Sequence, residues 1–183
     1  KRFDMKIGIV GSGDVARSLS LGLIDLGYEV MLGTRYPDKR EVKSWKKNVG
    51  KKGSLGSTTE AADFGDIVIL AIAWHAAENV LSQIRPEAAG KIVIDVTNPL
   101  QFNDDQAPSL SVGHSISGGE LVQQSLPDSH VVKTLNIIGH ANMVQPNYKD
   151  GTPTMFMCGN NESAKNHTGE LLRSLGWDDI VDI

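Results

Sequence analysis

The chain contains 183 residues, of which 18 are basic and 22 are acidic, and it has one cysteine. Its net charge of −4 gives no indication of general nucleic-acid binding, and a single cysteine excludes both an internal disulfide and a cysteine-based zinc cluster. The length favours one domain, and the longest uninterrupted apolar run, residues 67–74, is too short to span a bilayer. The expectation is therefore a cytoplasmic protein without a membrane partner.

A short apolar strand at residues 7–10 runs into a glycine-rich turn with the pattern Gly-x-Gly-x-x-Ala. Gly11 allows the tight turn, Gly13 lets the backbone approach a pyrophosphate, and Ala16 lets the following helix pack closely against the strand. The pyrophosphate would lie at the helix N-terminus, where backbone N–H groups are unpaired. The predicted cofactor contacts in this turn are Gly11, Ser12, Gly13, Asp14 and Val15.

The sequence around this turn supports a dinucleotide site. Apolar residues recur at helical spacing after the glycines, and Gly27 ends the predicted helix. Residues 28–32 then form a second strand. Together these elements make the strand-helix-strand unit of about thirty residues that a dinucleotide fingerprint requires.

The end of the second strand predicts which nicotinamide cofactor binds. Thr34, Arg35 and Lys39 offer a hydroxyl, a planar guanidinium and an ammonium to a ribose 2′-phosphate. Glu29 lies before the apolar part of the strand, so its carboxylate cannot reach the ribose hydroxyl. NADP is therefore favoured over NAD. Alternatively, Arg35 and Lys39 belong to a solvated basic face, because lysines crowd the segment that follows.

Strand and helix patterns alternate through the rest of the chain. The predicted elements are a helix at 37–48, a short strand near Leu55, a helix at 58–62, strands at 66–72 and 91–95, a polar surface loop at 101–117, a helix at 118–126, strands at 130–135 and 154–158, a helix at 162–175 and a last strand at 180–183. This alternation is typical of an α/β fold, a Rossmann-type doubly wound, mainly parallel sheet in a single domain.

Ligands of such sheets bind at the carboxyl ends of the strands. Candidates at the end of the strand at 66–72 are Ile72, Ala73, Trp74 and His75. Trp74 has two interpretations, a lid over the nicotinamide or a large core residue. No catalytic role is assigned to His75, because direct hydride transfer between two carriers needs no acid or base. Asp104-Asp105 is interpreted as part of a solvated loop, since nothing nearby completes a metal-ligand set.

Several stretches, in this order and spacing, resemble the NADPH-dependent reductases of the deazaflavin coenzyme F420 over nearly the whole chain. They are Gly11-Ser12-Gly13, Gly33-Thr34-Arg35, Ala73-Trp74, the turn at 95–100, the segment at 131–136 and Pro153-Thr154-Met155-Phe156. The resemblance implies that Thr34, Arg35 and Lys39 hold the NADP 2′-phosphate. It also implies that the nicotinamide lies near Ile72, Ala73, Trp74, Asn98 and Pro99, and that the C-terminal part forms the acceptor site near Leu135, Asn136 and Ile137.

The resemblance implies hydride transfer between NADPH and a ring-shaped carrier, the deazaflavin, catalysed mainly by positioning. Members also include the cytosolic domains of membrane metalloreductases, and a homodimer is a family expectation. One departure concerns Asp14, whose carboxylate would weaken pyrophosphate binding unless it points away or pairs with Arg17. Two alternatives stay open: an NADPH-dependent reductase of flavin, ferric chelate or imine, and a non-catalytic NADP-binding sensor.

Overall fold

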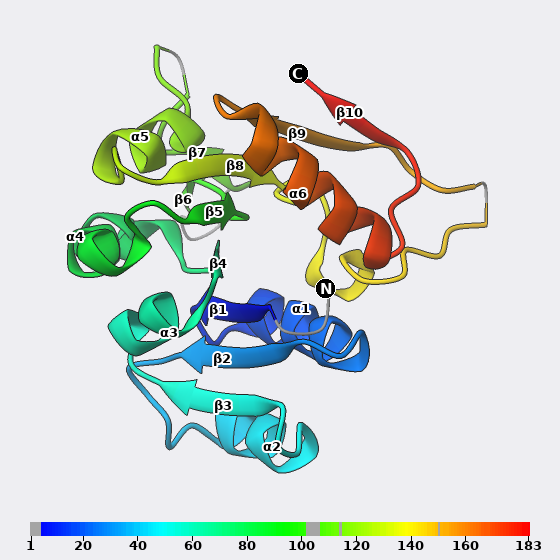
Figure 1. The fold of residues 1–183 in the computed structure, drawn as a ribbon. Helices are drawn as coiled ribbons and strands as arrows, with labels where there is room; N and C mark the ends of the chain where they lie inside the picture. The colour runs from blue at the N-terminus through cyan, green and yellow to red at the C-terminus, as the bar shows by residue number, and fades with distance from the viewer. Residues whose placement is uncertain (1–4, 102–106, 114, 150) are drawn as a thin grey trace.

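The computed structural model describes residues 5–101, 107–113, 115–149 and 151–183. Its centre is one eight-stranded sheet (Figure 1), in the order β10 (Ile180–Asp182), β9 (Met155–Gly159), β8 (His130–Thr134), β5 (Ile92–Asp95), β4 (Ile67–Leu70), β1 (Lys6–Val10), β2 (Glu29–Gly33) and β3 (Gly53–Gly56). Neighbouring strands are parallel except for β8 and β9, which are antiparallel. The prediction of a mainly parallel Rossmann-type sheet is confirmed.

Helices cover both faces of the sheet (Figure 1). The apolar cluster on one face includes side chains from α1 (Asp14–Asp25), α2 (Arg40–Asn48) and α6 (Glu162–Ser174). The cluster on the other face includes side chains from α3 (Thr58–Phe64), α4 (Ala77–Ala88) and α5 (Gly118–Ser125). Two short 3-10 helices, η2 (Trp74–Ala76) and η3 (His140–Asn142), lie in the connections after β4 and β8.

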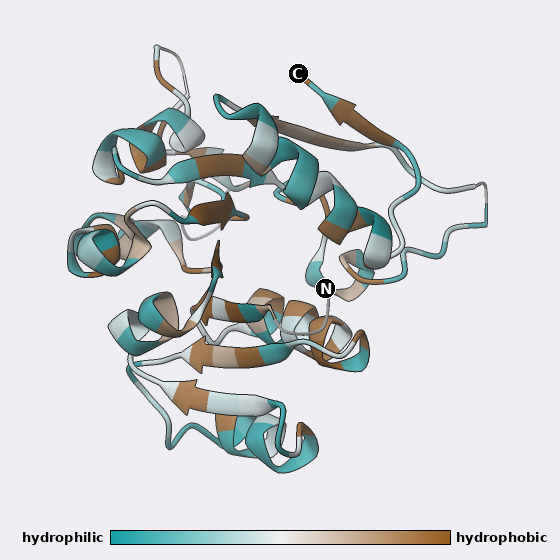
Figure 2. Ribbon diagram, in the orientation of Figure 1, coloured by the Kyte–Doolittle hydropathy of each residue, from teal (hydrophilic) through white to brown (hydrophobic). Residues whose placement is uncertain are grey.

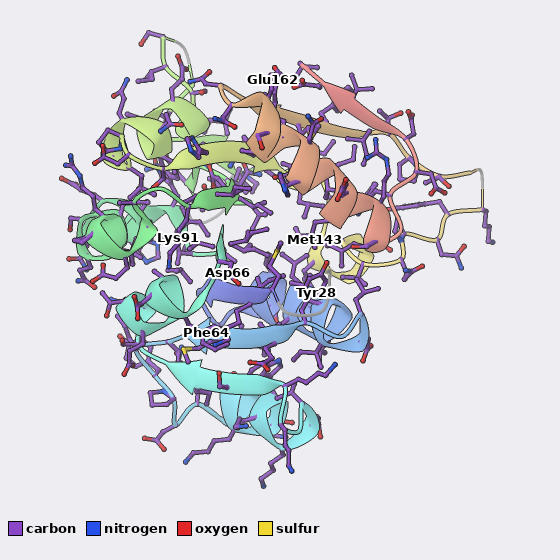
Figure 3. The ribbon with its side chains drawn as sticks, in the orientation of Figure 1. Tyr28, Phe64, Asp66, Lys91, Met143 and Glu162 are labelled. Carbon is purple, nitrogen blue, oxygen red and sulfur yellow. The ribbon has the colours of Figure 1, made fainter. Side chains whose placement is uncertain are left out.

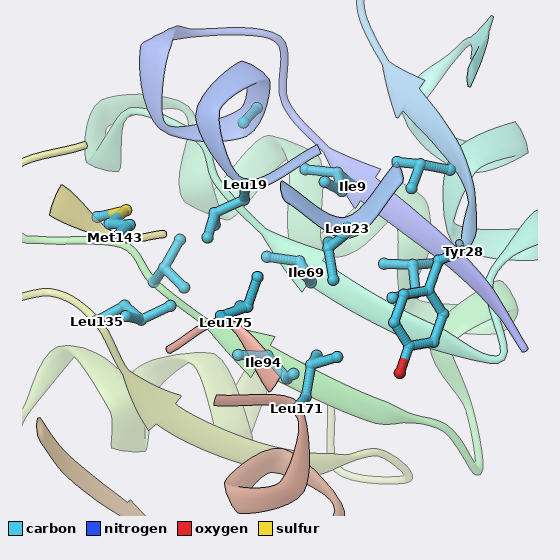
Figure 4. Packing of buried hydrophobic residues seen from close by; sticks show 14 of the residues in the cluster. Ile9, Leu19, Leu23, Tyr28, Ile69, Ile94, Leu135, Met143, Leu171 and Leu175 are labelled. Carbon is cyan, nitrogen blue, oxygen red and sulfur yellow. The ribbon is translucent and has the colours of Figure 1, made fainter. Parts of the chain in front are cut away.

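The central strands are buried on both faces, which explains why their sequences are continuously apolar. In β4, Ile67 and Ile69 belong to the cluster with α1 and α6, whereas Val68 and Leu70 belong to the cluster with α4. Figure 2 shows hydrophobic residues along these strands. Figure 4 shows Ile69 among side chains of α1, α6 and the neighbouring strands. This core fixes the strands whose carboxyl ends carry the predicted site.

Charged side chains at the amino ends of the strands have structural partners. The Lys91 ammonium donates hydrogen bonds to the carbonyls of Ala62 (2.8 Å) and Asp63 (2.9 Å), near the C-terminus of α3, where a cation complements the helix dipole. Asp66 accepts a hydrogen bond of 2.8 Å from the backbone N–H of Lys6. Figure 3 labels Lys91 and Asp66. These charges therefore belong to the fold rather than to a ligand site.

Two predicted elements differ from the structure. The helix predicted at 37–48 begins at Arg40, because residues 36–39 form a turn in which the Lys39 N–H donates to the Tyr36 carbonyl at 3.2 Å. The segment predicted as a loop at 101–117 includes part of a small antiparallel hairpin, β6 (Leu100–Gln101) and β7 (Ser109–Leu110). Strands of two residues carry no alternation that a sequence could reveal. Asp104 and Asp105 lie outside the described residues.

Acidification is expected to lower the free energy of unfolding by weakening two helix caps. The carboxylate of Glu60 accepts a hydrogen bond of 2.7 Å from the backbone N–H of Ser57, and that of Glu120 accepts one of 2.7 Å from Ser117. These hydrogen bonds lower the pKa of each carboxyl below its usual value. A carboxyl group whose pKa is lower in the folded chain than in the unfolded chain stabilises the fold at pH values above its unfolded pKa. This stabilisation is lost as the pH falls through the pKa of the folded chain. Urea unfolding between neutral pH and about pH 3 should show a shallower decline for Glu60→Gln/Glu120→Gln than for the unmodified chain. An equally steep decline in the variant would contradict this origin.

Candidate functional site

The glycine-rich turn lies between the end of β1 and the start of α1. Gly11 has φ +130°, and a Cβ there would lie 2.1 Å from the carbonyl oxygen of Ala71, so no other residue fits. A Cβ on Gly13 would meet no heavy atom within 4 Å. Gly13 is the N-cap of α1 and has no side chain. It therefore caps none of the free backbone N–H groups in the first turn of the helix. Open space in front of these donors fits a pyrophosphate.

Asp14 pairs with Arg17, which is one of the two arrangements expected to make a carboxylate tolerable at this position. Its carboxylate forms an ion pair with the Arg17 guanidinium, which also donates a hydrogen bond of 2.7 Å to the Ser12 carbonyl. Arg17 therefore compensates the negative charge and braces the glycine-rich turn. The contacts predicted for Gly11 to Val15 with the cofactor remain predictions that this geometry permits.

Thr34 connects the glycine-rich turn with the end of β2. Its side-chain oxygen accepts hydrogen bonds from the Ser12 hydroxyl (2.9 Å) and from the Tyr36 backbone N–H (3.0 Å). Because a hydroxyl has two acceptor sites and one donor, the Thr34 proton is left to donate to an anion. The residue itself is buried. The predicted pyrophosphate and 2′-phosphate ends of the site are thus physically linked.

An aromatic ring that the sequence analysis did not assign organises the two predicted cations. The Arg35 guanidinium carbon lies 5.4 Å from the centroid of the Tyr36 ring, and the Lys39 ammonium lies 4.9 Å from it. Cation–π attraction at these distances favours positions of both cations beside the ring. A signal was present in the sequence, because Tyr36 follows Arg35 directly and precedes Lys39 by one turn.

Replacing Tyr36 should loosen this pair of cations. Tyr36→Leu is expected to weaken NADPH binding by about fivefold, because each exposed cation–π contact is worth about 0.5–1 kcal/mol. NADH binding should hardly change, since NADH lacks the 2′-phosphate. Fluorescence titration measures the dissociation constants for NADPH and NADH. The matched control is Tyr148→Leu, because Tyr148 is also an exposed tyrosine. Unchanged NADPH affinity in Tyr36→Leu would show that the ring does not organise the cations.

The structure places Trp74 in a packed position beyond the end of β4. A Cβ on Gly118, the first residue of α5, would lie 3.4 Å from the Trp74 ring and 3.5 Å from Pro99. Trp74 is partly buried against the apolar cluster under α4 and α5. This packing favours the core interpretation of Trp74 over a free lid. Ile72 packs against the same cluster, whereas Ala73 and His75 are exposed.

The turns that follow β5 and β8 lie against one another. Asn98 donates a side-chain hydrogen bond of 3.1 Å to the Asn136 carbonyl, so residues predicted for the nicotinamide and for the acceptor are in direct contact. Leu135 has φ +61° with its side chain buried, a conformation that is costly for a residue other than glycine. Ile137 is exposed. Strained backbone in the turn predicted for the acceptor is typical of functional positions.

A cavity of about 620 Å³ adjoins these turns and is lined in part by Asn98, Pro99, Lys133, Asn136 and Cys158. Burial lowers the pKa of the Lys133 ammonium, and the nearby Asp95 carboxylate offsets only part of that effect. Burial raises the pKa of the Cys158 thiol, which disfavours the nucleophilic thiolate. This environment does not favour a nucleophilic role for Cys158.

In the ranges that the structure describes, no helix has the length and apolar character needed to cross a membrane. Within the same ranges, no three or more His, Cys, Asp or Glu side chains gather as a metal site would require.

The open N-terminus of α1, the hydroxyl of Thr34 and the two cations after β2 are typical of a Rossmann-type domain that binds a nicotinamide dinucleotide. The sequence profile of the family described as NADP oxidoreductase, coenzyme F420-dependent, matches residues 6–99, about half of the chain. The chain belongs to this family. The predictions of an NADP cofactor and of an oxidoreductase are confirmed at the level of the family.

Similar proteins cover most of the chain. A solved structure of a proposed F420-dependent NADP reductase from Arthrobacter sp. FB24 has a TM-score of 0.92 and 32% identity, and the match covers 98% of this chain and 84% of that one. The F420-dependent NADP reductase of Methanocaldococcus jannaschii is 29% identical over 97% of this chain and 83% of its own length. Metalloreductase STEAP3 of Rattus norvegicus is 31% identical over 94% of this chain. The chain spans about a third of the length of the STEAP metalloreductases it matches (32%).

Proposed function

We propose that this chain transfers a hydride between NADPH and a ring-shaped carrier, the deazaflavin coenzyme F420. The observation that carries the proposal is the contact between Asn98 and Asn136, which joins the turn predicted for the nicotinamide to the turn predicted for the acceptor. The similarity to F420-dependent NADP reductases along nearly the whole chain supports the choice of deazaflavin.

In this proposal NADPH binds with its pyrophosphate on the residues Gly11, Ser12, Gly13, Asp14 and Val15. Thr34, Arg35 and Lys39 hold the 2′-phosphate, by one hydroxyl proton and two cations. The nicotinamide lies at the residues Ile72, Ala73, Trp74, Asn98 and Pro99. The carrier stacks beside it at Leu135, Asn136 and Ile137, in the C-terminal part of the single domain.

The reduced nicotinamide supplies the hydride, and the protein contributes position. No side chain is assigned as an acid or base, because a hydride carries both electrons and the proton that completes a reduced carrier is available from solvent. Holding two rings in contact replaces an unfavourable encounter in solution, which can remove much of the entropic barrier. Catalysis then depends on how firmly the two turns are held relative to one another.

Mixing the purified chain with NADPH and oxidised deazaflavin tests the proposal through the visible absorbance of the carrier. Bleaching with NADPH and little bleaching with NADH is the expected result. Similarity to metalloreductases supports a second candidate function, reduction of flavin or a ferric chelate, so these acceptors belong in the same assay. NADPH binding without reduction of any acceptor, imines included, would favour a non-catalytic sensor and overturn the proposal. Light scattering tests the homodimer that the family resemblance leads us to expect.

A further inference from the structure

A buried ion pair lies directly behind the turn that follows β5. Asp95 is the last residue of β5 and is paired in register with Lys133 of β8. The Asp95 carboxylate is fully buried, and the Lys133 side chain is 14% exposed. The Lys133 Nζ lies 3.1 Å from the Asp95 Oδ2. Such a pair bridges two adjacent strands at their carboxyl ends, where the candidate site lies.

Thr97 completes this group and extends it into the turn. Lys133 Nζ donates to the Thr97 carbonyl oxygen and lies 3.4 Å from the Thr97 hydroxyl. The Thr97 backbone N–H and hydroxyl both donate to the other oxygen of Asp95, at 2.9 and 2.7 Å. Every polar group in this cluster therefore has a partner inside it. The backbone just before Asn98 is held by Lys133 from the neighbouring strand.

The same two turns are joined a second time by the hydrogen bond from Asn98 to the Asn136 carbonyl. Lys133 lies two residues before Leu135, whose strained backbone begins the second turn. The two turns are therefore joined by two hydrogen bonds, one from Lys133 to Thr97 and one from Asn98 to Asn136, which we call ties. These ties leave the turns little freedom to separate or slide.

We propose that Lys133 is a positioning residue, which holds the Asn98-Pro99 turn at a fixed distance from the turn at Leu135 to Ile137. This inference rests on the proposed function, in which one turn contacts the nicotinamide and the other contacts the acceptor. Hydride transfer requires the two reacting carbons in close contact, and a displacement of about 1 Å can slow a reaction about 100-fold. Lys133 acts through the turns, because its hydrogen bonds go to Asp95 and Thr97.

The chemistry of the cluster favours a positional role over a stabilising one. Moving two charges out of water is costly, and well-packed apolar side chains of the same size often stabilise a fold at least as well. Lys133 is nevertheless buried with Asp95 beside the 620 Å³ cavity, which Asn98, Pro99 and Asn136 also line. An apolar side chain could fill the same space, but it could not donate a hydrogen bond to the Thr97 carbonyl.

The test replaces the whole ion pair, because removal of Lys133 alone would leave a buried, unpaired carboxylate and could unfold the chain. Lys133→Met/Asp95→Asn keeps an amide oxygen that accepts from Thr97 and removes only the tie from β8. The matched control is Lys165→Met/Asp182→Asn. Lys165 is also a buried lysine on α6, and it pairs with Glu162 at 2.8 Å and with Asp182 at 2.6 Å. Asp182 lies on β10, which β9 separates from β8 in the sheet.

Three measurements separate positioning from general destabilisation. In Lys133→Met/Asp95→Asn, we expect kcat with NADPH and deazaflavin to fall by about 100-fold. Adenosine 2′,5′-bisphosphate, which reports only the phosphate end, should bind as it does to the unmodified chain. Amide hydrogen exchange at residues 96–100 and 135–138 should accelerate. The control variant should show none of these changes.

The outcomes also separate this inference from the proposed function. If the unmodified chain reduces no deazaflavin, the proposed function fails, but hydrogen exchange in the two turns still tests the tie. Unchanged exchange at 96–100 in the double variant overturns the positioning role. An equal loss of kcat in Lys165→Met/Asp182→Asn also overturns it, because the effect would then follow from lost stability alone.

Discussion

Arg35→Ala is expected to weaken NADPH binding by about 10- to 100-fold, the effect of losing one or two charge-assisted hydrogen bonds to a phosphate. NADH affinity should change by no more than about twofold, because NADH offers no 2′-phosphate to the guanidinium. Arg35 is exposed and its described partner is the Tyr36 ring, so its removal leaves no buried group unsatisfied. Fluorescence titrations with both nucleotides give the ratio of affinities.

Arg85→Ala is the matched control for this variant, since Arg85 is an exposed arginine in the last turn of α4. It should change neither affinity. Equal losses for NADPH and NADH in Arg35→Ala would remove the assignment of the 2′-phosphate site. They would instead support the alternative in which Arg35 belongs to the solvated basic face.

The fold was predictable because its strongest signals are local. A strand buried on both faces must be apolar throughout, and Ile67 to Leu70 satisfies this condition in four consecutive residues. The glycine at position 11 is required by backbone geometry rather than by a ligand, so its spacing from the strand marks the turn unambiguously. What the sequence could not predict was the hairpin of β6 and β7, whose pairing depends on contacts such as that from Ser111 N–H to the Pro99 carbonyl at 2.8 Å.

The sequence predicted the candidate site residues whose roles follow from their type and from their place after a strand. It did not predict contacts between residues that are far apart in the chain. Thr34 and Arg35 follow a strand end, so their place could be inferred. The tie from Lys133 to Thr97 joins residues 36 positions apart in the chain, and only the pairing of β5 with β8 brings them together. Likewise, no pattern indicates that Leu135 has a positive φ, because leucine rarely adopts it.

Gly13→Val is expected to abolish most NADPH binding while the chain stays folded. Gly13 has φ −73° and ψ −172°, which valine can adopt, and a Cβ there meets no protein atom within 4 Å. The loss of a glycine N-cap should lower the free energy of unfolding by about 1 kcal/mol or less. The added methyl groups would occupy the open space in front of α1 and clash with a pyrophosphate, for a loss of about 3 kcal/mol, or about 100-fold in affinity.

Gly11→Ala distinguishes this steric block from damage to the fold. A Cβ at Gly11 would lie 2.1 Å from the carbonyl oxygen of Ala71 at φ +130°, so this smaller change should lower the free energy of unfolding by about 3 kcal/mol or more. Urea unfolding should therefore separate the two variants before any nucleotide is added. If Gly13→Val binds NADPH as tightly as the unmodified chain, the space before α1 does not hold the pyrophosphate. If it unfolds as readily as Gly11→Ala, Gly13 is needed for the fold, and the loss of binding says nothing about the site.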